Sequence, residues 1–406
     1  MRKKNEEYSG IVREEINSES FLERARKKAS YFTRKRKLPF PKLCMFLIGI
    51  VHECLAVAFR RFTEKTEDTV TMTEQSLSKA RNKIRWEAFE HLSKVVGRFG
   101  YTGDYDTWNG YRIWAIDGTK IALPNYPMLA RLFGEEKGSP MARGSILYDC
   151  LNYIVVDGHI EPLAVDERTL AKRHLDSLAE IKTDKEIILF DRGYPSERMI
   201  DYCEEHGFFY IMRVRGKFNL DVDNQESNDG FVQIGKNKVR VIKVVLDTGE
   251  VETLLTNLIG NFDFKELYFI RCGIEIKFDV LKNTLELENF SGRSETAIRQ
   301  DFYIHIIASN MLAASFWEAQ EIADKQRNNG DNKHEYKINM AQAASAIRDY
   351  LPIAILTDDP LRQTMLLKKM TAIIASAVIP IRPNRKVPRK PNNRKSKFHH
   401  NRKPNL

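Results

Sequence analysis

Residues 268–282 read YFIRCGIEIKFDVLK, and this stretch has polar side chains at positions 268, 271, 275 and 282. At about 100° per residue, an α-helix would place Tyr268, Arg271, Glu275 and Lys282 within an arc of roughly 60°. Two interpretations fit such a face. The carboxylate holds a metal ion and the cations hold phosphate, or the face is solvated and carries ordinary charge pairs. Taken alone, the stretch favours the second interpretation, so the rest of the chain has to decide.

Length and composition indicate a globular protein of two or three domains. The chain has 406 residues, 42% of them hydrophobic, which is enough to bury a sizeable core. No CxxC pair appears among the five cysteines, so neither a zinc site nor a disulfide framework is expected, and scattered thiols fit a reducing cytosol. The longest apolar run, residues 44–59, is broken by His52 and Glu53 and is short for a membrane span. We therefore expect a cytoplasmic protein without a membrane partner.

The net charge of +10 is concentrated at the C-terminus. Residues 382–406 contain ten lysines and arginines and no acid, so the remaining residues are balanced. A tail of Arg, Lys, Pro and Asn cannot bury apolar surface, and we expect it to be disordered. Its charge would attract nucleic acid or simply keep the protein soluble, and the tail alone leaves both interpretations open.

Helical patterns dominate both ends of the remaining chain. Residues 1–100 are expected to form an N-terminal helical DNA-binding region, and residues 331–381 a C-terminal helical region. The segment that begins at Thr73 resembles a helix-turn-helix recognition element, with a cap followed by small and basic residues. The residues expected to face DNA are Ser76, Ser78, Lys79, Arg81 and Lys83.

Two aspartates interrupt apolar strand patterns in the middle of the chain. Asp117 lies in RIWAIDGTKIAL, and Asp191 ends KEIILFD. A carboxylate in a buried strand is costly unless it is paired or bound to a metal, although Asp117 with Gly118 also fits a hairpin turn. Asp191 would lie at the carboxyl end of an inner strand, where α/β folds place catalytic groups.

The segments between these aspartates predict antiparallel strands and then a helix. Residues 145–156 and 160–165 are expected to be strands joined at Asp157 and Gly158, and residues 167–181 a helix. Glu167 and His174 lie on that helix, and ordinary helix surface is the favoured interpretation for both. Residues 215–260 have a different texture, with glycines and asparagines between short strand-like runs, which indicates a β-rich insertion.

The order of elements suits a mixed sheet with helices on its faces, of ribonuclease H type. In this α/β (α+β) arrangement Asp117, Asp191 and Glu275 would converge at one end of the sheet. We expect the catalytic core to comprise residues 101–214 and 261–330, separated by the insertion at 215–260. Carboxylate ligands of this kind select Mg²⁺ or Mn²⁺, and a pair of such ions is the expected cofactor.

These motifs resemble one family of enzymes. Tyr268, Arg271, Glu275 and Lys282 match the pattern Y-x₂-R-x₃-E-x₆-K, which is similar to the signature of the DDE transposases of bacterial insertion sequence family 4. The segment DRGY at 191–194 looks like that family's second-acid motif, and AIDGTKI resembles its first. The match covers roughly residues 70–330. It favours the first interpretation of the 268–282 face, in which the carboxylate holds a metal ion and the cations hold phosphate.

The resemblance implies specific roles for these residues. Asp117, Asp191 and Glu275 would be the catalytic metal ligands, and Tyr268, Arg271 and Lys282 would bind DNA phosphates. It also implies cut-and-paste movement of an insertion sequence by a homo-oligomer that acts on double-stranded DNA, at terminal inverted repeats and at a target. Such an enzyme would be associated with the nucleoid of a bacterial cytoplasm. Alternatives are a metal-dependent nuclease of the same fold without strand transfer, and a catalytically lapsed DNA-binding protein.

Overall fold

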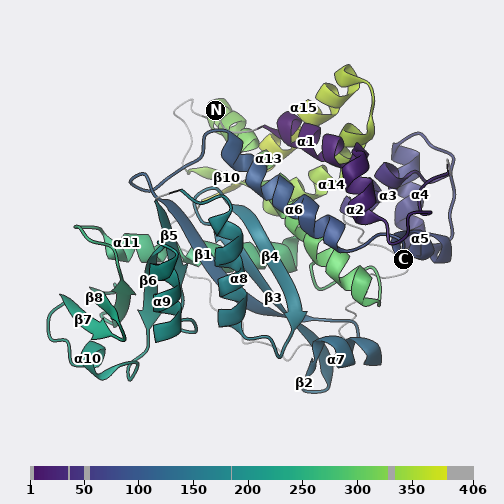
Figure 1. The fold of residues 1–406 in the computed structure, drawn as a ribbon. Coiled ribbons are helices and arrows are strands. Elements are labelled where there is room, and N and C mark those ends of the chain that lie inside the picture. Colours follow the sequence, from purple (N-terminus) through teal and green to yellow (C-terminus); the bar gives the residue numbers. More distant parts are fainter. Residues whose placement is uncertain (1–3, 35–36, 50–54, 184, 328–333, 382–406) are drawn as a thin grey trace. The chain divides into compact units, whose positions relative to one another are not determined.

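The computed structural model describes residues 4–34, 37–49, 55–183, 185–327 and 334–381, and the chain divides into two compact units. The first unit consists of Met1–Asp104, Ala122–Met141 and Val280–Leu406. The second consists of Tyr105–Ile121 and Ala142–Asp279. Figure 1 shows the elements of both, coloured along the sequence. The basic tail at residues 382–406 lies outside the described residues, so its expected disorder stays a prediction.

The second unit is built around a mixed β-sheet. Its core elements are β1 (Arg112–Ala122), β3 (Ser139–Asp149), β4 (Ile154–Pro162), α8 (Glu167–Ala179), β5 (Glu186–Phe190), α9 (Glu197–Glu205) and β6 (Phe209–Val214). The insertion adds α10 (Leu220–Asp223), β7 (Asp229–Ile234), β8 (Asn237–Val245) and β9 (Val251–Thr256), followed by α11 (Phe264–Phe269) and α12 (Cys272–Asp279).

The strand order of this sheet is β2-β3-β1-β5-β6-β9-β8-β7, where β2 is the short strand Glu135–Glu136, and β4 also pairs with β3. β1, β5 and β6 are parallel, whereas β3 runs antiparallel to β4. At opposite ends of β1, the N–H of Leu123 donates to Pro140 and the carbonyl of Ile113 accepts from Cys150, so β1 and β3 are also antiparallel. The helices α8 and α9 lie on one face (Figure 1). This arrangement confirms the predicted ribonuclease H-like α/β class.

The central parallel strands are buried, as expected for strands whose sequences are nearly continuous apolar runs. All residues of β5 are buried, as are the first five residues of β1. Asp117 follows that buried segment within β1, and Asp191 comes immediately after β5. The strand placement predicted for both aspartates is therefore confirmed, and Asp117 does not lie in a hairpin turn.

The predicted hairpin between β3 and β4 was placed wrongly. The turn falls between Asp149 and Ile154, where Tyr153 has a positive φ of 61°. Asp157 and Gly158 lie inside β4, opposite Leu147 and Ile146. An Asp-Gly pair marks many turns, but here the Asp149 carboxylate accepts hydrogen bonds from the N–H groups of Leu151 and Asn152, which stabilises the turn earlier in the chain.

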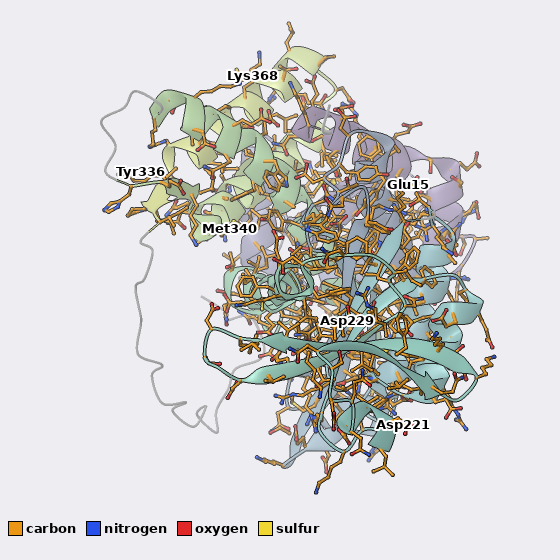
Figure 2. All side chains as sticks on the ribbon, turned by 90° about the vertical axis from the view of Figure 1, so that its left-hand side faces the viewer. Glu15, Asp221, Asp229, Tyr336, Met340 and Lys368 are labelled. Atoms are coloured by element: carbon orange, nitrogen blue, oxygen red, sulfur yellow. The ribbon has the colours of Figure 1, made fainter. Side chains whose placement is uncertain are left out.

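The insertion consists mainly of strands, and these strands extend the sheet. β9 pairs with β6 and β8, and β7 closes the edge. Asp229 begins β7 and Asp221 lies on α10 (Figure 2). The insertion is therefore continuous with the sheet that carries the two aspartates.

The first unit is mainly helical. Its helices are α1 (Asn5–Asn17), α2 (Glu19–Ala25), α3 (Phe40–Ile48), α4 (Leu55–Lys65), α5 (Glu74–Arg81), α6 (Glu87–Phe99), α7 (Pro127–Phe133), α13 (Glu295–Arg327), α14 (Met340–Leu356) and α15 (Pro360–Ser376). Short strands are β2 (Glu135–Glu136), β10 (Tyr336–Ile338) and β11 (Val378–Pro380). The helix α13 is buried over most of residues 297–315, and Trp86 stacks on its Tyr303. No helix among the described residues is long and apolar enough to cross a membrane.

The expectation that Arg81 faces DNA is wrong. The helix α5 begins at a Thr73 cap, as predicted, but Arg81 at its end is buried. Its guanidinium donates to Gln300 Oε1 at 2.6 Å and to the carbonyl of Ala297 at 2.9 Å, and it forms an ion pair with Asp301 at 2.8 Å. Arg81 therefore anchors α5 to α13.

The other four predicted DNA contacts remain predictions. Ser76 and Lys79 are exposed, and Ser78 and Lys83 are half-buried. All four belong to the first unit.

Replacing Arg81 by alanine should destabilise the first unit by about 3–5 kcal/mol, because Asp301 would be left as a buried charge without its cation. Thermal unfolding followed by circular dichroism measures this effect. The matched control is Lys79→Ala on the exposed side of the same helix, which should change stability by no more than about 0.5 kcal/mol. Equal melting temperatures for the two variants would contradict the anchoring role.

Candidate active site

Three acidic side chains lie around one arginine in the second unit. Arg271 lies between α11 and α12 and is buried, with 9% of its side chain exposed. Its Nη2 is 3.1 Å from Asp117 Oδ2 and 3.9 Å from Asp191 Oδ2, and its Nη1 is 3.2 Å from Glu275 Oε1. The structure thus brings Asp117, Asp191 and Glu275 together with Arg271.

The three carboxylates differ in their access to solvent. Asp117 is the most enclosed, with 20% of its side chain exposed, whereas the side chain of Glu275 is 67% exposed. Burial raises the pKa of Asp117 to about 6, although Arg271 and the N–H of Gly118 act in the opposite direction. The charges of Asp191 and Glu167 raise this pKa further. Burial is therefore the main reason that the ionised form of Asp117 is disfavoured.

Backbone N–H groups orient both aspartates. Asp117 Oδ1 accepts from Gly118 at 2.8 Å, and Asp191 Oδ1 accepts from Gly193 at 2.7 Å. A Cβ atom on Gly193 would lie 3.0 Å from Asp191 Oδ1, which is closer than side chains normally approach. A glycine at position 193 therefore lets the Asp191 carboxylate fold back onto the backbone.

Glu167 is a fourth acid beside the site. It lies in the first turn of α8 and forms an ion pair with Arg143. Its Cγ would be 3.2 Å from a Cβ on Gly118, and its Oε2 3.7 Å from one on Gly193. Interpreting Glu167 as ordinary helix surface therefore misses its position beside both aspartates.

The stretch 268–282 is not one continuous helix, contrary to the prediction. Hydrogen bonds from Gly273 to Ile270 and from Ile274 to Arg271 span three residues and tighten the chain between α11 and α12. Residues Val280–Thr284 then form a π-helical segment, η2, with a wider turn. The arc of roughly 60° calculated for a regular helix therefore does not apply to all four polar residues.

The two remaining residues of the signature lie in different surroundings. The Tyr268 hydroxyl donates to the carbonyl of Phe190 at 3.5 Å, and burial raises the pKa of Tyr268 to about 12. Lys282 belongs to the first unit, where it forms an ion pair with Glu288 at 3.3 Å. Phosphate binding by Tyr268, Arg271 and Lys282 stays a prediction.

Tyr194, the aromatic residue that follows Asp191 and Arg192, is completely buried. Among the described residues its hydroxyl has no hydrogen-bond partner. Burial raises its pKa well above the ordinary tyrosine value, and the charges of Asp117 and Glu167 act in the same direction. The ring of Tyr194 therefore has no exposed face in this conformation.

A buried polar network lies beneath Asp117. His174 on α8 is completely buried, so the sequence-based interpretation of it as helix surface is wrong. Its Nδ1 is 2.7 Å from Asp157 Oδ2, and its Nε2 is 2.9 Å from the hydroxyl of Ser145. Ser145 in turn donates to the carbonyl oxygen of Asp117 at 3.2 Å. The network therefore connects α8 and β4 to the strand that carries the first acid.

His159 completes this cluster. Its Nε2 is 3.1 Å from Asp157 Oδ2. Although burial opposes ionisation, hydrogen bonds from His159 and His174 hold the pKa of Asp157 well below its usual range. Within the part of the chain that the structure describes, Asp157, His159 and His174 are the group whose ligand atoms lie close enough to hold a metal ion. The contact of His174 with Asp157 is a hydrogen bond, and His159 lies within ion-pair distance of the same carboxylate.

The acids around Arg271 suit a hard divalent cation. All three offer carboxylate oxygens, the ligand type that Mg²⁺ and Mn²⁺ prefer. A bound cation would favour the ionised form of Asp117, which burial disfavours. The donor set therefore fits the predicted metal in ligand type, whereas its three carboxylates are not a group close enough to hold one ion in the described residues.

Replacing Asp117 by asparagine should stabilise the protein in chelator at pH 8. Because the native pKa of Asp117 is raised to about 6, the native state loses stability as the pH rises from about 4 through 6. Asp117→Asn removes this cost, so its gain should be about 1–3 kcal/mol at pH 8 and much smaller at pH 4. Melting curves at both pH values measure the gain.

The exposed acid Asp221 on α10 supplies the control, since Asp221→Asn should show no such dependence on pH. A gain for Asp117→Asn that is the same at both pH values would contradict the electrostatic explanation.

The chain is 23% identical over 186 residues to the Escherichia coli (strain K12) protein named "Putative transposase InsZ", a match that covers 43% of this chain. The chain spans 60% of the length of that relative. Among solved structures, it is similar to a piggyBac transposase synaptic complex with hairpin DNA, with 11% identity and a TM-score of 0.44 over 96% of this chain and 86% of the other.

A family described as the transposase DDE domain matches residues 108–311, which is half of the chain. The match begins before β1 and ends within α13, so it includes the four residues Asp117, Asp191, Arg271 and Glu275. The chain therefore belongs to the transposase DDE domain family.

Proposed function

We propose that this protein is a transposase of the insertion sequence family 4 type, which moves its element by cut-and-paste cleavage at terminal inverted repeats and strand transfer into target DNA. The observation that carries the proposal is the contact of Arg271 with Asp117 and Glu275, together with its approach to Asp191. Membership of the DDE family supports it.

In this proposal Asp117, Asp191 and Glu275 are the metal ligands. Two bound Mg²⁺ ions would activate the attacking water or 3′-hydroxyl and stabilise the leaving oxygen. The N–H groups of Gly118 and Gly193 hold the two aspartates in place and leave the second oxygen of each carboxylate for the ligand role.

Arg271 is proposed to act on both the acids and the DNA. Its guanidinium offers a planar set of donors that suits a carboxylate or a phosphate. Its Nε is buried and has no partner among the described residues, so a donor remains for an incoming acceptor. When the three acids bind metal ions, they would hold the guanidinium of Arg271 less tightly. Its Nη atoms could then bind a phosphate beside the cut.

The proposal also covers the residues that contact DNA and the assembly of the protein on it. Tyr268 and Lys282 would contact phosphates flanking the cut, and Ser76, Ser78, Lys79 and Lys83 would contact the terminal repeats. A homo-oligomer would hold the two DNA ends together in the bacterial cytoplasm. A nuclease of the same fold would cut the ends without joining them to a target.

Each of Asp117→Asn, Asp191→Asn and Glu275→Gln should lower Mg²⁺-dependent cleavage of the element's ends to below about one hundredth of wild type, because each removes a charged ligand. Affinity for the same DNA should be almost unchanged. A plasmid that carries the gene with its flanking DNA serves as substrate, and gel analysis measures release of the element and joining to a target.

The control is Glu266→Gln, which alters an exposed acid on α11 and should cleave like wild type. Undiminished cleavage by Glu275→Gln would remove Glu275 from the site. Cleavage without joining would instead assign the protein to the nucleases.

A further inference from the structure

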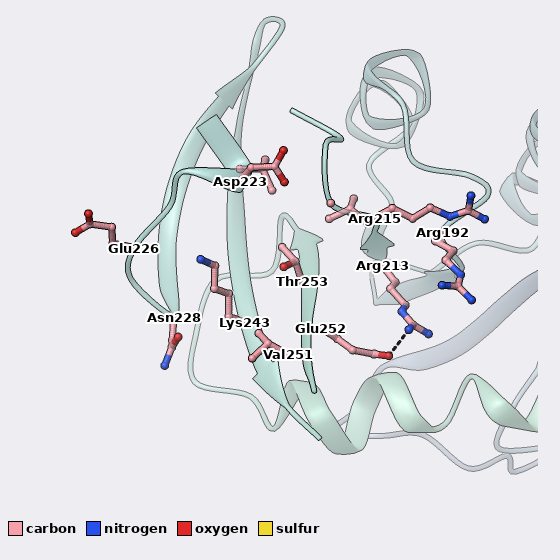
Figure 3. A pocket seen from close by; sticks show the side chains of 13 residues that line it. Arg192, Arg213, Arg215, Asp223, Glu226, Asn228, Lys243, Val251, Glu252 and Thr253 are labelled. Carbon is pink, nitrogen blue, oxygen red and sulfur yellow. Dashed lines mark ion pairs between the residues drawn. The ribbon is translucent and has the colours of Figure 1, made fainter. Parts of the chain in front are cut away.

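A hollow of about 630 Å³ lies in the second unit beside the carboxyl end of β6 (Figure 3). One side carries Arg192, Arg213 and Arg215, and the insertion strands β8 and β9 form the opposite side. The remaining lining includes the side chains of three valines, Val214, Val222 and Val251. Its volume lies within the range of about 300–1,000 Å³ typical of small-ligand sites.

The arginines of this hollow are not equivalent. Arg213 is half-buried and forms an ion pair with Glu252 at 2.5 Å, so its charge is largely neutralised. Arg192 and Arg215 are exposed, and neither forms an ion pair with another described residue. Figure 3 shows the ends of all three side chains gathered on the same side of the hollow. Two guanidiniums are therefore available there to a ligand.

The arginine side of the hollow adjoins the candidate active site. Arg192 follows Asp191 directly in the sequence. Phe190 of β5 is paired with Met212 of β6, so Asp191 and Arg213, which follow them, lie at the same edge of the sheet. A ligand that contacts Asp191 can thus continue towards Arg215 along one surface of the same unit.

The rim opposite the arginines carries acidic side chains. Asp223 and Glu226 are exposed there, and the amine of Lys243 is bonded to the carbonyl of Gln225. A phosphate would be repelled by these two acids and attracted to the arginines. The distribution of charge therefore orients a ligand whose anionic part lies at Arg192 and Arg215 and whose less charged part lies over the valines.

We propose that this hollow binds the sugar–phosphate backbone of the DNA strand that leads away from the cut at Asp191, with Arg192 and Arg215 bound to successive phosphates. This inference deepens the proposed transposase function and rests on it. The bidentate geometry of Arg suits phosphate, and the valines and rim acids would face the sugars and base edges.

Charge reversal at Arg215 tests the proposal. Arg215→Glu should bind a fluorescein-labelled duplex of about 30 base pairs of random sequence roughly tenfold more weakly at low salt. The slope of log affinity against log salt concentration should fall by about one. Fluorescence anisotropy in chelator measures both quantities without any cleavage. Arg215→Gln should show the same change to a smaller extent.

Lys238→Glu is the matched control, because Lys238 is an exposed cation on β8 outside the hollow. Melting curves establish that each variant is folded. If Arg215→Glu binds DNA no more weakly than Lys238→Glu, the proposal is overturned. Binding of free dATP that Arg215→Glu abolishes, with unchanged affinity for DNA, would assign the hollow to a small nucleotide and also overturn it.

A photocrosslinking residue, p-benzoylphenylalanine, places the contact directly. Introduced at position 215 it should crosslink to the duplex, and at position 238 it should not. Because binding is measured without metal, the two proposals fail separately. Wild-type protein that binds through Arg215 but never cleaves would contradict the transposase function alone, and normal cleavage with no effect of Arg215→Glu on binding would contradict the hollow alone.

Discussion

The position of the Arg271 guanidinium among three carboxylates is the constraint on which the site depends. Asp117 and Asp191 come from neighbouring parallel strands, and their charges repel each other. A cation beside Asp117 favours its ionised form. Arg271 supplies that cation, and the tightened turn between α11 and α12 places it there. The interruption of the helix is therefore part of how the site is assembled.

The acids were predictable because their signal is local. An aspartate that breaks or ends an apolar strand can be read directly from residues 112–123 and 185–191. Parallel pairing then brings Asp117 and Asp191 together, since β1 and β5 are neighbours. The shape of the stretch 268–282 was not predictable in this way. Periodicity assumes a constant turn, whereas hydrogen bonds over three residues and a π-helical segment change it.

The burial of polar residues was also not predictable from the sequence pattern. His174 and Arg81 occur on helices whose patterns also suit exposed polar faces. Their burial depends on partners distant in sequence, Ser145 and Asp157 for His174, and Asp301 for Arg81. The one available signal was Asp157 within an apolar run, because a buried carboxylate needs a donor. Interpreting Asp157 as a turn residue removed that signal.

The buried network and the acids are linked through the backbone of β1. Asp157 is acceptor-only as a carboxylate, so Nδ1 of His174 carries the proton between them. The hydroxyl of Ser145 has one hydrogen, which can be donated either to Asp117 or to Nε2 of His174. Donation to the Asp117 carbonyl leaves Nε2 of His174 as the donor to Ser145, whereas donation to Nε2 leaves that carbonyl without this hydrogen bond. The hydroxyl of Ser145 thus connects the buried His174–Asp157 pair to the strand that carries the first acid.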